Sequence, residues 1–227
     1  MLEVRDLSAA YGRAQVLFGL EFSAHRGEVL VLLGHNGAGK SSTLKSLMGL
    51  LRHRRGAVVF DGVHIESLPP HRIARLGLGY VPEDRRIFGD LTVRENLEVG
   101  RQAARRGQAV WTTARLFELF PDLEPMQSRI AAQMSGGEQQ MLAVARTLMG
   151  NPAAILLDEP SEGLAPLVVE RMAAAILKLK SEGLCVVLSE QNLRFARRVA
   201  DRACLLEQGR IRATGTLDAI HSSYGLG

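Results

Sequence analysis

The sequence has little cysteine and no long hydrophobic run. Its two cysteines, Cys185 and Cys204, stand inside short apolar runs that predict strands. They therefore favour core positions in a reduced compartment over a disulfide framework. Unbroken apolar runs such as residues 29–33 fall far short of the ~20 residues that a membrane-spanning helix needs. The first residues, MLEVRDL, carry no basic-then-apolar signal region, so we expect a soluble, cytoplasmic chain whose role at a membrane is peripheral.

The sequence is also poor in aromatic residues, and its positive and negative charges nearly balance. Lys and Arg number 28 against 24 Asp and Glu, and this net charge of +4 fits an anionic ligand without indicating nucleic acid. Phe, Trp and Tyr make up 5% of the chain, and Phe195 is the one such residue within the arginine clusters at 52–55, 101–106 and 194–198. We therefore expect no base-stacking groove and no nucleic-acid partner. The histidines lack paired metal-ligand spacing, which argues against a transition-metal site.

Apolar strands alternate with helical segments over most of the chain. Continuous apolar runs, typical of strands buried on both faces, predict a mostly parallel sheet covered by helices on both sides. The expected strands include 29–33, 153–159, 183–189 and 202–208, with helices at 40–51, 134–150, 167–181 and 193–200. We expect one α/β domain over 1–227, with an N-terminal antiparallel β portion. Its core is expected at about 1–82 and 151–227, and an inserted α-helical subdomain at about 83–150.

Residues 34–41, GHNGAGKS, fit the pattern G-x-x-x-x-G-K-[ST] between a buried strand and a helix. Glycine lets backbone N–H groups wrap phosphates, Lys40 neutralises the β- and γ-phosphate charge, and the Ser41 hydroxyl ligates Mg²⁺. A chance glycine turn is the alternative, but it does not explain a lysine and a serine in register. The expected nucleotide-binding residues are Gly34, His35, Asn36, Gly37, Ala38, Gly39, Lys40, Ser41 and Ser42, with His35 a variable position without a role of its own.

Residues 153–159, AAILLDE, form an apolar run that ends in two carboxylates. Asp158, at the end of the strand, is expected to hold Mg²⁺ directly or through water. Glu159 is expected to orient and deprotonate the attacking water. The alternative is an ordinary strand followed by a polar turn at Pro160, and it loses weight beside a phosphate-binding loop. Together the two motifs predict a nucleoside triphosphatase with a P-loop NTPase core.

The stretch MSGGEQQ, residues 134–140, begins a helix with two glycines. Ser135 and Glu138 form a capping box, which satisfies backbone donors at a helix start. The cap does not require Gly136 and Gly137, and each glycine in a helix costs about 1 kcal/mol relative to alanine. Glycine there leaves the N–H groups bare, so an anion could approach the positive end of the helix.

The phosphate-binding loop, the later SGG and then LLDEP together resemble the ATP-binding subunit of an ABC transporter, from Leu2 to about Ala219. The resemblance implies a site shared between two ATPase subunits, identical or sister, with two ATP molecules sandwiched head to tail. In it, Ser135, Gly136, Gly137 and Glu138 of one subunit bind the γ-phosphate of ATP held by the other. Tyr11 would stack on adenine, although an ordinary aromatic residue at a strand end is an open alternative.

Three positions depart from the common pattern of that family: Glu83, Ala165 and Gln191 replace the usual glutamine, aspartate and histidine. The same departures resemble a branch of importers for branched-chain amino acids and related small amphipathic solutes. Glu83 could still serve Mg²⁺ as an oxygen ligand. Gln191 could donate a hydrogen bond to the γ-phosphate but cannot carry a proton, so it is expected to orient and not to titrate. Lys40, Glu159 and Gln191 are the expected catalytic residues.

The resemblance also implies partners at the inner face of the cell membrane. These are transmembrane permease subunits, which contact the segment after Glu83, and indirectly a periplasmic binding protein. Ile87, Phe88 and Leu91 are candidates for the permease contact, with core packing as the alternative. A non-transport ABC ATPase acting on DNA or ribosomes usually carries long insertions, and none fits in 227 residues. An exporter ATPase is a further alternative, and the transported solute is not specified by this chain.

Overall fold

The computed structural model describes residues 1–104 and 110–224, so Arg105 and Arg106 of one arginine cluster lie outside the described residues. The strands are β1 (Leu2–Tyr11), β2 (Ala14–Ala24), β3 (Val29–Leu33), β4 (His53–Phe60), β5 (Val63–His64), β6 (Leu78–Val81), β7 (Ala154–Asp158), β8 (Cys185–Glu190), β9 (Arg202–Glu207) and β10 (Arg210–Gly215). The α-helices are α1 (Lys40–Leu47), α2 (Pro70–Leu76), α3 (Val93–Gly100), α4 (Thr113–Leu119), α5 (Gly136–Leu148), α6 (Pro166–Ser181), α7 (Leu193–Val199) and α8 (Leu217–Tyr224). Short 3-10 helices cover Pro121–Met126 (η1) and Ala131–Gln133 (η2).

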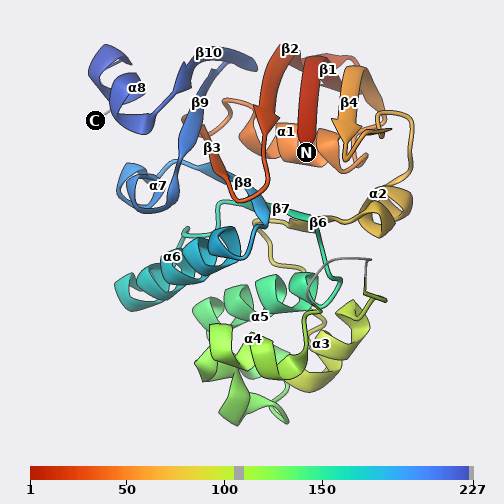
Figure 1. The fold of residues 1–227 in the computed structure, drawn as a ribbon, viewed down its shortest axis with the longest axis vertical. Helices are drawn as coiled ribbons and strands as arrows, with labels where there is room; N and C mark the ends of the chain where they lie inside the picture. Colours follow the sequence, from red (N-terminus) through yellow and green to blue (C-terminus); the bar gives the residue numbers. More distant parts are fainter. Residues whose placement is uncertain (105–109, 225–227) are drawn as a thin grey trace.

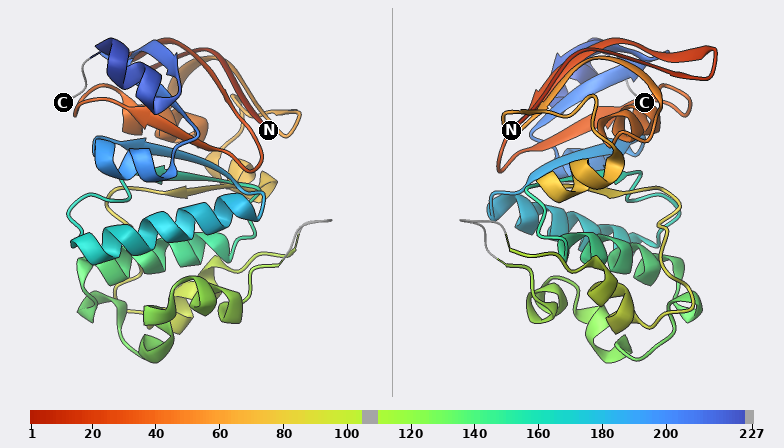
Figure 2. Two further views of the ribbon diagram at one scale, coloured as in Figure 1. Left: turned by 60° about the vertical axis from the view of Figure 1, so that its left-hand side comes forward. Right: turned by 90° about the vertical axis from the view of Figure 1, so that its right-hand side faces the viewer.

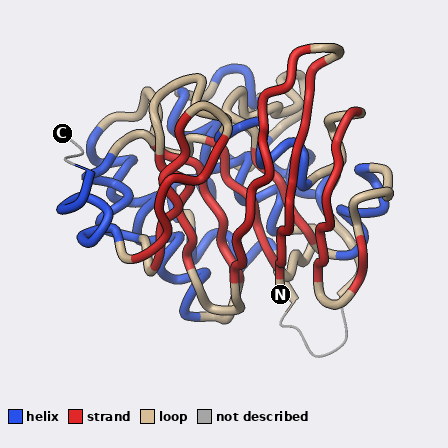
Figure 3. Tube along the Cα trace, turned by 90° about the horizontal axis from the view of Figure 1, so that it is seen from above, coloured by secondary structure: helices blue, strands red, loops and turns tan. Residues whose placement is uncertain are grey.

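The strands of the described residues form two sheets (Figures 1 and 3). The larger sheet has the order β10-β9-β3-β8-β7-β6, and its neighbours are parallel except for the antiparallel hairpin of β9 and β10. The smaller sheet, in the order β2-β1-β4-β5, is antiparallel. The predicted fold class is therefore confirmed: a mostly parallel sheet, an N-terminal antiparallel portion and inserted helices.

The large sheet separates two hydrophobic cores. Alternate residues of its central strands face opposite sides, as the period of a strand requires. Val29, Val31 and Leu33 of β3 join a core with α5, α6 and α7, whereas Leu30 and Leu32 join a core with α1 and the small sheet. Both cysteines are free and buried, as predicted, and they lie in the core on the α1 side. Because the strands are covered on both faces, their sequence is apolar throughout instead of alternating.

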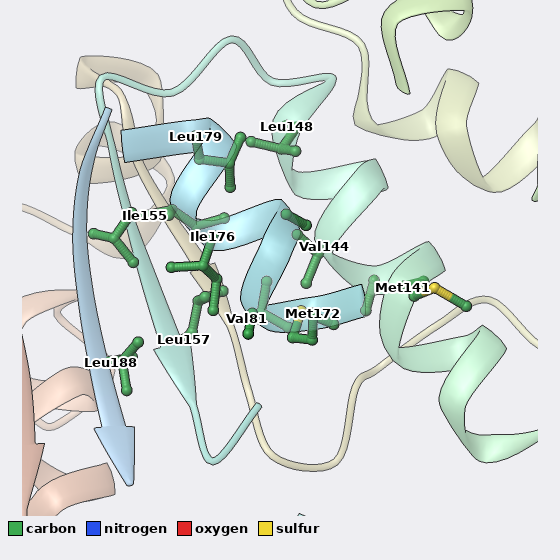
Figure 4. Packing of buried hydrophobic residues seen from close by; sticks show 14 of the residues in the cluster. Val81, Met141, Val144, Leu148, Ile155, Leu157, Met172, Ile176, Leu179 and Leu188 are labelled. Carbon is green, nitrogen blue, oxygen red and sulfur yellow. The ribbon is translucent and has the colours of Figure 1, made fainter. Parts of the chain in front are cut away.

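The two helices α5 and α6 lie side by side beneath the large sheet (Figures 2 and 4). Figure 4 shows Val144 and Leu148 of α5 and Ile176 and Leu179 of α6 packed toward the strand residue Ile155. Helices α3 and α4 lie on the far side of α5, away from the sheet (Figure 2). No helix among the described residues is long and apolar enough to cross a membrane.

Helix ends are set by glycine and by capping residues, and one helix is shorter than its apolar pattern predicted. The helix expected to reach residue 51 ends at Leu47, because Gly49 adopts a left-handed φ of +73°. The Thr92 capping box at the start of α3 is present, with Thr92 Oγ1 accepting a bond from Glu95 N at 3.2 Å. Helix α8 was not expected from the sequence.

Candidate nucleotide-binding and catalytic site

The phosphate-binding loop (residues 34–41) requires glycine at two positions for steric reasons. Gly34 has a φ of +155°, and a Cβ there would lie 2.5 Å from the backbone oxygen of Leu206. Gly39, the N-cap of α1, has a φ of +109° and would bring a Cβ to 2.9 Å from Leu17 Cδ2. Both distances are far below van der Waals contact, so the loop follows a path that only glycine permits.

The tip of the β9–β10 hairpin holds the phosphate-binding loop in place. Gly209 N donates a hydrogen bond to Ala38 O in the loop at 2.9 Å, and Gly209 O accepts one from Phe18 N of β2 at 2.9 Å. A Cβ on Gly209 would lie 2.0 Å from Val16 O. The backbone of the loop is thus fixed by strands from both ends of the chain.

The ammonium group of Lys40 is surrounded by oxygen atoms. Lys40 is 4% exposed, and its Nζ donates to Gly34 O at 2.7 Å and to His35 O at 3.2 Å. The same Nζ forms an ion pair with Glu159 Oε1 at 2.9 Å. A buried ammonium needs such partners, and phosphate oxygens are chemically equivalent ones. The lysine is therefore placed to exchange its present ligands for those of a nucleotide.

Asp158 accepts three hydrogen bonds at the end of β7, where it is 1% exposed. Its Oδ1 accepts from Ser41 Oγ at 2.8 Å and from Ser189 Oγ at 2.7 Å, and its Oδ2 accepts from Tyr80 OH at 3.1 Å. Burial and the charge of Asp158 raise the pKa of Tyr80 well above its usual value, so the phenol stays a donor. Ser41 and Asp158 offer the hard oxygen donors that Mg²⁺ prefers.

Glu159 adopts a left-handed backbone conformation, with a φ of +48°. This conformation costs a residue other than glycine about 1–3 kcal/mol and is characteristic of functional sites. Two hydrogen bonds from Glu159 N, to Ser189 O at 3.2 Å and Ser189 Oγ at 3.0 Å, hold the backbone there. Glu159 also lines a cavity with Gln191, which is exposed in the turn after β8. The structure thus brings the predicted catalytic residues Lys40, Glu159 and Gln191 to one end of the large sheet.

Glu83 and Tyr11 lie at the rim of a second cavity, which Asp158 also lines. Glu83 is exposed on the loop after β6, and no hydrogen bond or ion pair among the described residues joins it to Ser41 or Asp158. Partial burial and the charges of Glu162, Asp158 and Glu159 raise the pKa of Glu83. Tyr11 is 48% exposed at the end of β1. Of the predicted metal ligands, the structure therefore joins Ser41 and Asp158, whereas Glu83 stands apart on the rim.

The SGG turn (residues 135–137) begins α5, and its capping box is present. Ser135 N donates to Glu138 Oε2 at 2.7 Å, and Ser135 Oγ accepts from Glu138 N at 3.4 Å. The structure adds a packing reason for one glycine, since a Cβ on Gly137 would lie 2.9 Å from Val168 Cγ1 of α6. A Cβ on Gly136 would meet only the flexible guanidinium end of Arg85. Gly137 thus allows α5 to pack closely on α6, a role that the sequence did not indicate.

The SGG turn and the phosphate-binding loop of one chain belong to opposite faces of the large sheet. The loop leads into α1, which packs in the core shared with the small sheet. The SGG turn leads into α5, which packs in the core on the other face. The two turns of one chain therefore lead into helices that cover opposite faces of the sheet.

The family model described as ABC transporter matches residues 17–162. The chain belongs to the ABC transporter family. As an ABC transporter ATP-binding subunit it hydrolyses ATP, and the predicted resemblance is confirmed.

Relatives of this ABC subunit are named for branched-chain amino acid transport and for lipopolysaccharide export. The high-affinity branched-chain amino acid transport ATP-binding protein BraG of Pseudomonas aeruginosa is 42% identical over 93% of this chain and 91% of its own. The probable branched-chain amino acid transport ATP-binding protein LivF of Archaeoglobus fulgidus is 35% identical, covering 97% of this chain and 94% of its own. The lipopolysaccharide export system ATP-binding protein LptB of Haemophilus influenzae is 33% identical over 97% of this chain and 92% of its own.

Solved structures of ABC ATP-binding subunits share the whole fold. The structure of an ATP-binding subunit of an ABC transporter has a TM-score of 0.84 at 33% identity, covering 100% of this chain and 94% of the other. The dimeric structure of a bacterial ABC transporter cassette has a TM-score of 0.82 at 25% identity, covering 96% and 99%. That cassette is a dimer in its solved structure.

Three polar residues of this ABC site were missed by sequence reasoning. Tyr80 and Ser189 bind Asp158, and Glu190 is a buried carboxylate next to Gln191. The sequence did contain a signal for Ser189 and Glu190. They follow the apolar run 184–188 in the same way that Asp158 and Glu159 follow the apolar run 153–157. Tyr80 carried no such signal, since an aromatic residue in a short strand ordinarily predicts core packing.

Proposed function

We propose that this chain is the ATP-hydrolysing subunit of an ABC importer for branched-chain amino acids or related small amphipathic solutes. Hydrolysis rests on one observation above all: Lys40 pairs with Glu159, and Ser41 donates to Asp158, so the phosphate-binding loop contacts both carboxylates at the end of β7. Import is supported by the greater similarity to BraG and LivF than to LptB. It is also supported by Glu83, Ala165 and Gln191, the departures shared with that importer branch.

In this proposal the residues act on ATP in a definite order. Backbone N–H groups of the phosphate-binding loop and Lys40 bind the phosphates, which compete with Glu159 for the ammonium. Glu159, once released, accepts a proton from the water that attacks the γ-phosphorus, and the bond to the ADP oxygen breaks. Ser41 and Asp158 would hold Mg²⁺, which supplies charge neutralisation when bound. Gln191 orients groups at the γ-phosphate through its amide and carries no proton.

A second ATPase subunit completes the site in this proposal. The SGG turn and the phosphate-binding loop belong to opposite faces of the sheet, so each turn is available to the nucleotide of a partner. The test uses the Glu159→Gln variant, which is expected to bind Mg-ATP without hydrolysing it. Light scattering should show a monomer that becomes a dimer only with Mg-ATP, and the added change Ser135→Arg should abolish the dimer. A persistent monomer would point to a sister subunit, or to an SGG turn that is only a helix cap.

A groove between α2 and α5 is the proposed contact for a permease. Phe88, 47% exposed, lines this groove with Arg75, Arg86 and Arg146. No acidic residue lines it among the described residues, so it suits an apolar segment that carries a carboxylate. Ile87, another of the three candidates, is partly buried and packs against the core.

Lipopolysaccharide-type export is the second candidate, because LptB is also a close relative. Purification of the tagged chain from its native membranes separates the two, because the permease and binding protein that accompany it can be identified. Import predicts that the complex, reconstituted with its binding protein, hydrolyses ATP faster when leucine-like amino acids are added. Stimulation by a lipopolysaccharide and not by amino acids would replace the import proposal with export.

A further inference from the structure

Glu190 is a buried acidic residue that takes no part in the hydrolysis scheme above. It ends β8, is 1% exposed and directly precedes Gln191. Alternate strand residues face opposite sides, so Ser189 faces Asp158 on the α1 side whereas Glu190 faces the side covered by α6 and α7. Burial of a carboxylate is unfavourable unless hydrogen bonds compensate for the lost water.

Both oxygens of Glu190 accept backbone hydrogen bonds, and the two donors belong to different loops. Ser161 N donates to Oε1 at 3.1 Å, and Asn192 N donates to Oε2 at 3.1 Å. Ser161 lies in a turn closed by the bond from Glu162 N to Glu159 O at 3.1 Å. Asn192 is the N-cap of α7 and directly follows Gln191. One side chain therefore joins the turn after Glu159 to the turn that carries Gln191.

We propose that Glu190 is a positioning residue for ATP hydrolysis: its carboxylate fixes the turns of Glu159 and Gln191 relative to each other, and so aligns both side chains. The proposal rests on the role of Glu159 as general base, proposed above. Glu159 and Gln191 line one cavity, and Glu190 lies in its wall between them. A small loss of alignment is costly in such a site, since a misplacement of about 1 Å can lower a rate about 100-fold.

The charge of Glu190 gives this role a pH dependence. Burial raises the pKa of Glu190 to about 7, the charge of Glu159 acts in the same direction, and the hydrogen bonds from Ser161 and Asn192 oppose it. Only the ionised carboxylate presents two oxygens free of protons to the two N–H donors. Both backbone hydrogen bonds to Glu190 are therefore complete above pH 7, and the connection between the two turns weakens as the pH falls. The other charged groups around the cavity are Glu159 with its partner Lys40, Glu162, Glu170, Arg194 and Arg198.

The test is the pH profile of ATP hydrolysis by the full chain and by Glu190→Gln, from pH 6 to pH 9. Glutamine keeps the size of the side chain but turns an NH₂ group toward one of the two N–H donors. We expect kcat at pH 8 to fall roughly tenfold or more while KM for ATP stays within about twofold, because the phosphate-binding loop is untouched. The rise of wild-type kcat through an apparent pKa near 7 is expected to disappear. A role limited to folding would not remove that rise.

Two control variants assign the titration to Glu190. Glu170→Gln makes the same chemical change on α6 in the same cavity, and His64→Gln removes an exposed histidine outside the site. Both are expected to keep the rise near pH 7. Thermal unfolding and ATP binding confirm that each variant is folded. If Glu190→Gln does not fold, Glu190→Asp decides: a carboxylate that is too short should lower kcat several-fold and keep the rise.

Wild-type kcat and an unchanged profile in Glu190→Gln would overturn the proposal, as would wild-type kcat in Glu190→Asp where only that variant folds. Glu159→Gln run in parallel separates this failure from that of the proposed function. If Glu159→Gln is inactive while Glu190→Gln is normal, the general base stands and only the positioning role fails. If Glu159→Gln keeps its activity, the hydrolysis scheme itself fails.

Discussion

Lys40 Nζ lies 2.9 Å from Glu159 Oε1, and both side chains are almost fully buried. The lysine that phosphates require is therefore bound to the carboxylate proposed to activate water. Because glutamine binds the ammonium less strongly, Glu159→Gln should bind ATP at least as tightly as the wild type. Its kcat should be about 10²–10⁴-fold lower, the range for loss of a general base. Nucleotide titration and single-turnover hydrolysis measure both, and equal losses of binding and turnover would contradict this account.

Tyr80→Phe is expected to weaken the proposed magnesium site without abolishing it. The change removes one donor to the buried Asp158 carboxylate, and a hydrogen bond to a charged group contributes about 1.5–3 kcal/mol. The Mg²⁺ concentration for half-maximal hydrolysis should rise several-fold. Tyr224→Phe is the control, because that hydroxyl donates to Arg212 O at 3.2 Å on the surface of the molecule. Equal magnesium dependence in the two variants would rule out this role for Tyr80.

Gly137→Ala and Gly136→Ala should have opposite effects although they are neighbours. A methyl group at Gly137 meets Val168 of α6 at 2.9 Å, and overpacking of this kind costs about 1–3 kcal/mol. At Gly136 it meets only the mobile end of Arg85, so alanine should recover up to about 1 kcal/mol of helix propensity. Urea unfolding measures both, and Val168→Ala should partly rescue Gly137→Ala. Absence of that rescue would show that the glycine is required for another reason.

Stability should fall as the pH rises from about 4 to about 7, and Glu190 should account for much of the fall. Its pKa is about 7 in the folded chain against about 4.3 in an unfolded one. Between these values the folded state holds a proton that the unfolded state has released, so the free energy of unfolding decreases with increasing pH. The loss is roughly 3 kcal/mol between pH 4 and pH 8. Urea unfolding at both values should show a correspondingly smaller difference in Glu190→Gln.

Phe88→Ala and Ile87→Ala should separate partner binding from stability. Phe88 is exposed in the groove, so its loss should reduce recovery of the chain with its permease subunits from membranes. Ile87 packs against the core, so its loss should mainly lower the melting temperature. Undiminished recovery of Phe88→Ala with the permease would remove this groove from the proposed contact.

Sequence reasoning reached the fold and the nucleotide chemistry because both depend on local patterns. The apolar runs at β3 and β7 predict buried parallel strands. The phosphate-binding loop follows β3, and Asp158 is the last residue of β7. Parallel strands bring those ends to one edge of the sheet, so Ser41 and Asp158 could be paired without coordinates.

The contacts that sequence reasoning missed join segments far apart in the chain or depend on steric detail. Tyr80 meets Asp158 across the register of β6 and β7, and Glu190 meets Ser161 across two loops. The packing of Gly137 on Val168 depends on how closely α5 approaches α6, which no local pattern encodes. The position of Glu83 on the rim reflects the path of its loop after β6.

Through the hydrogen bond from Gly209 N to Ala38 O, the β9–β10 hairpin supports the phosphate-binding loop near the start of the sequence. A chain truncated shortly before residue 209 would keep every motif from GHNGAGKS (34–41) to SEQN (189–192). It would nevertheless lose the hydrogen bond from Gly209 that holds the phosphate-binding loop. Regulatory segments or engineered tags joined after α8 leave that support in place, whereas deletions that reach back into β10 do not. Truncations that remove Gly209 are therefore expected to loosen the phosphate-binding loop even though every motif is kept.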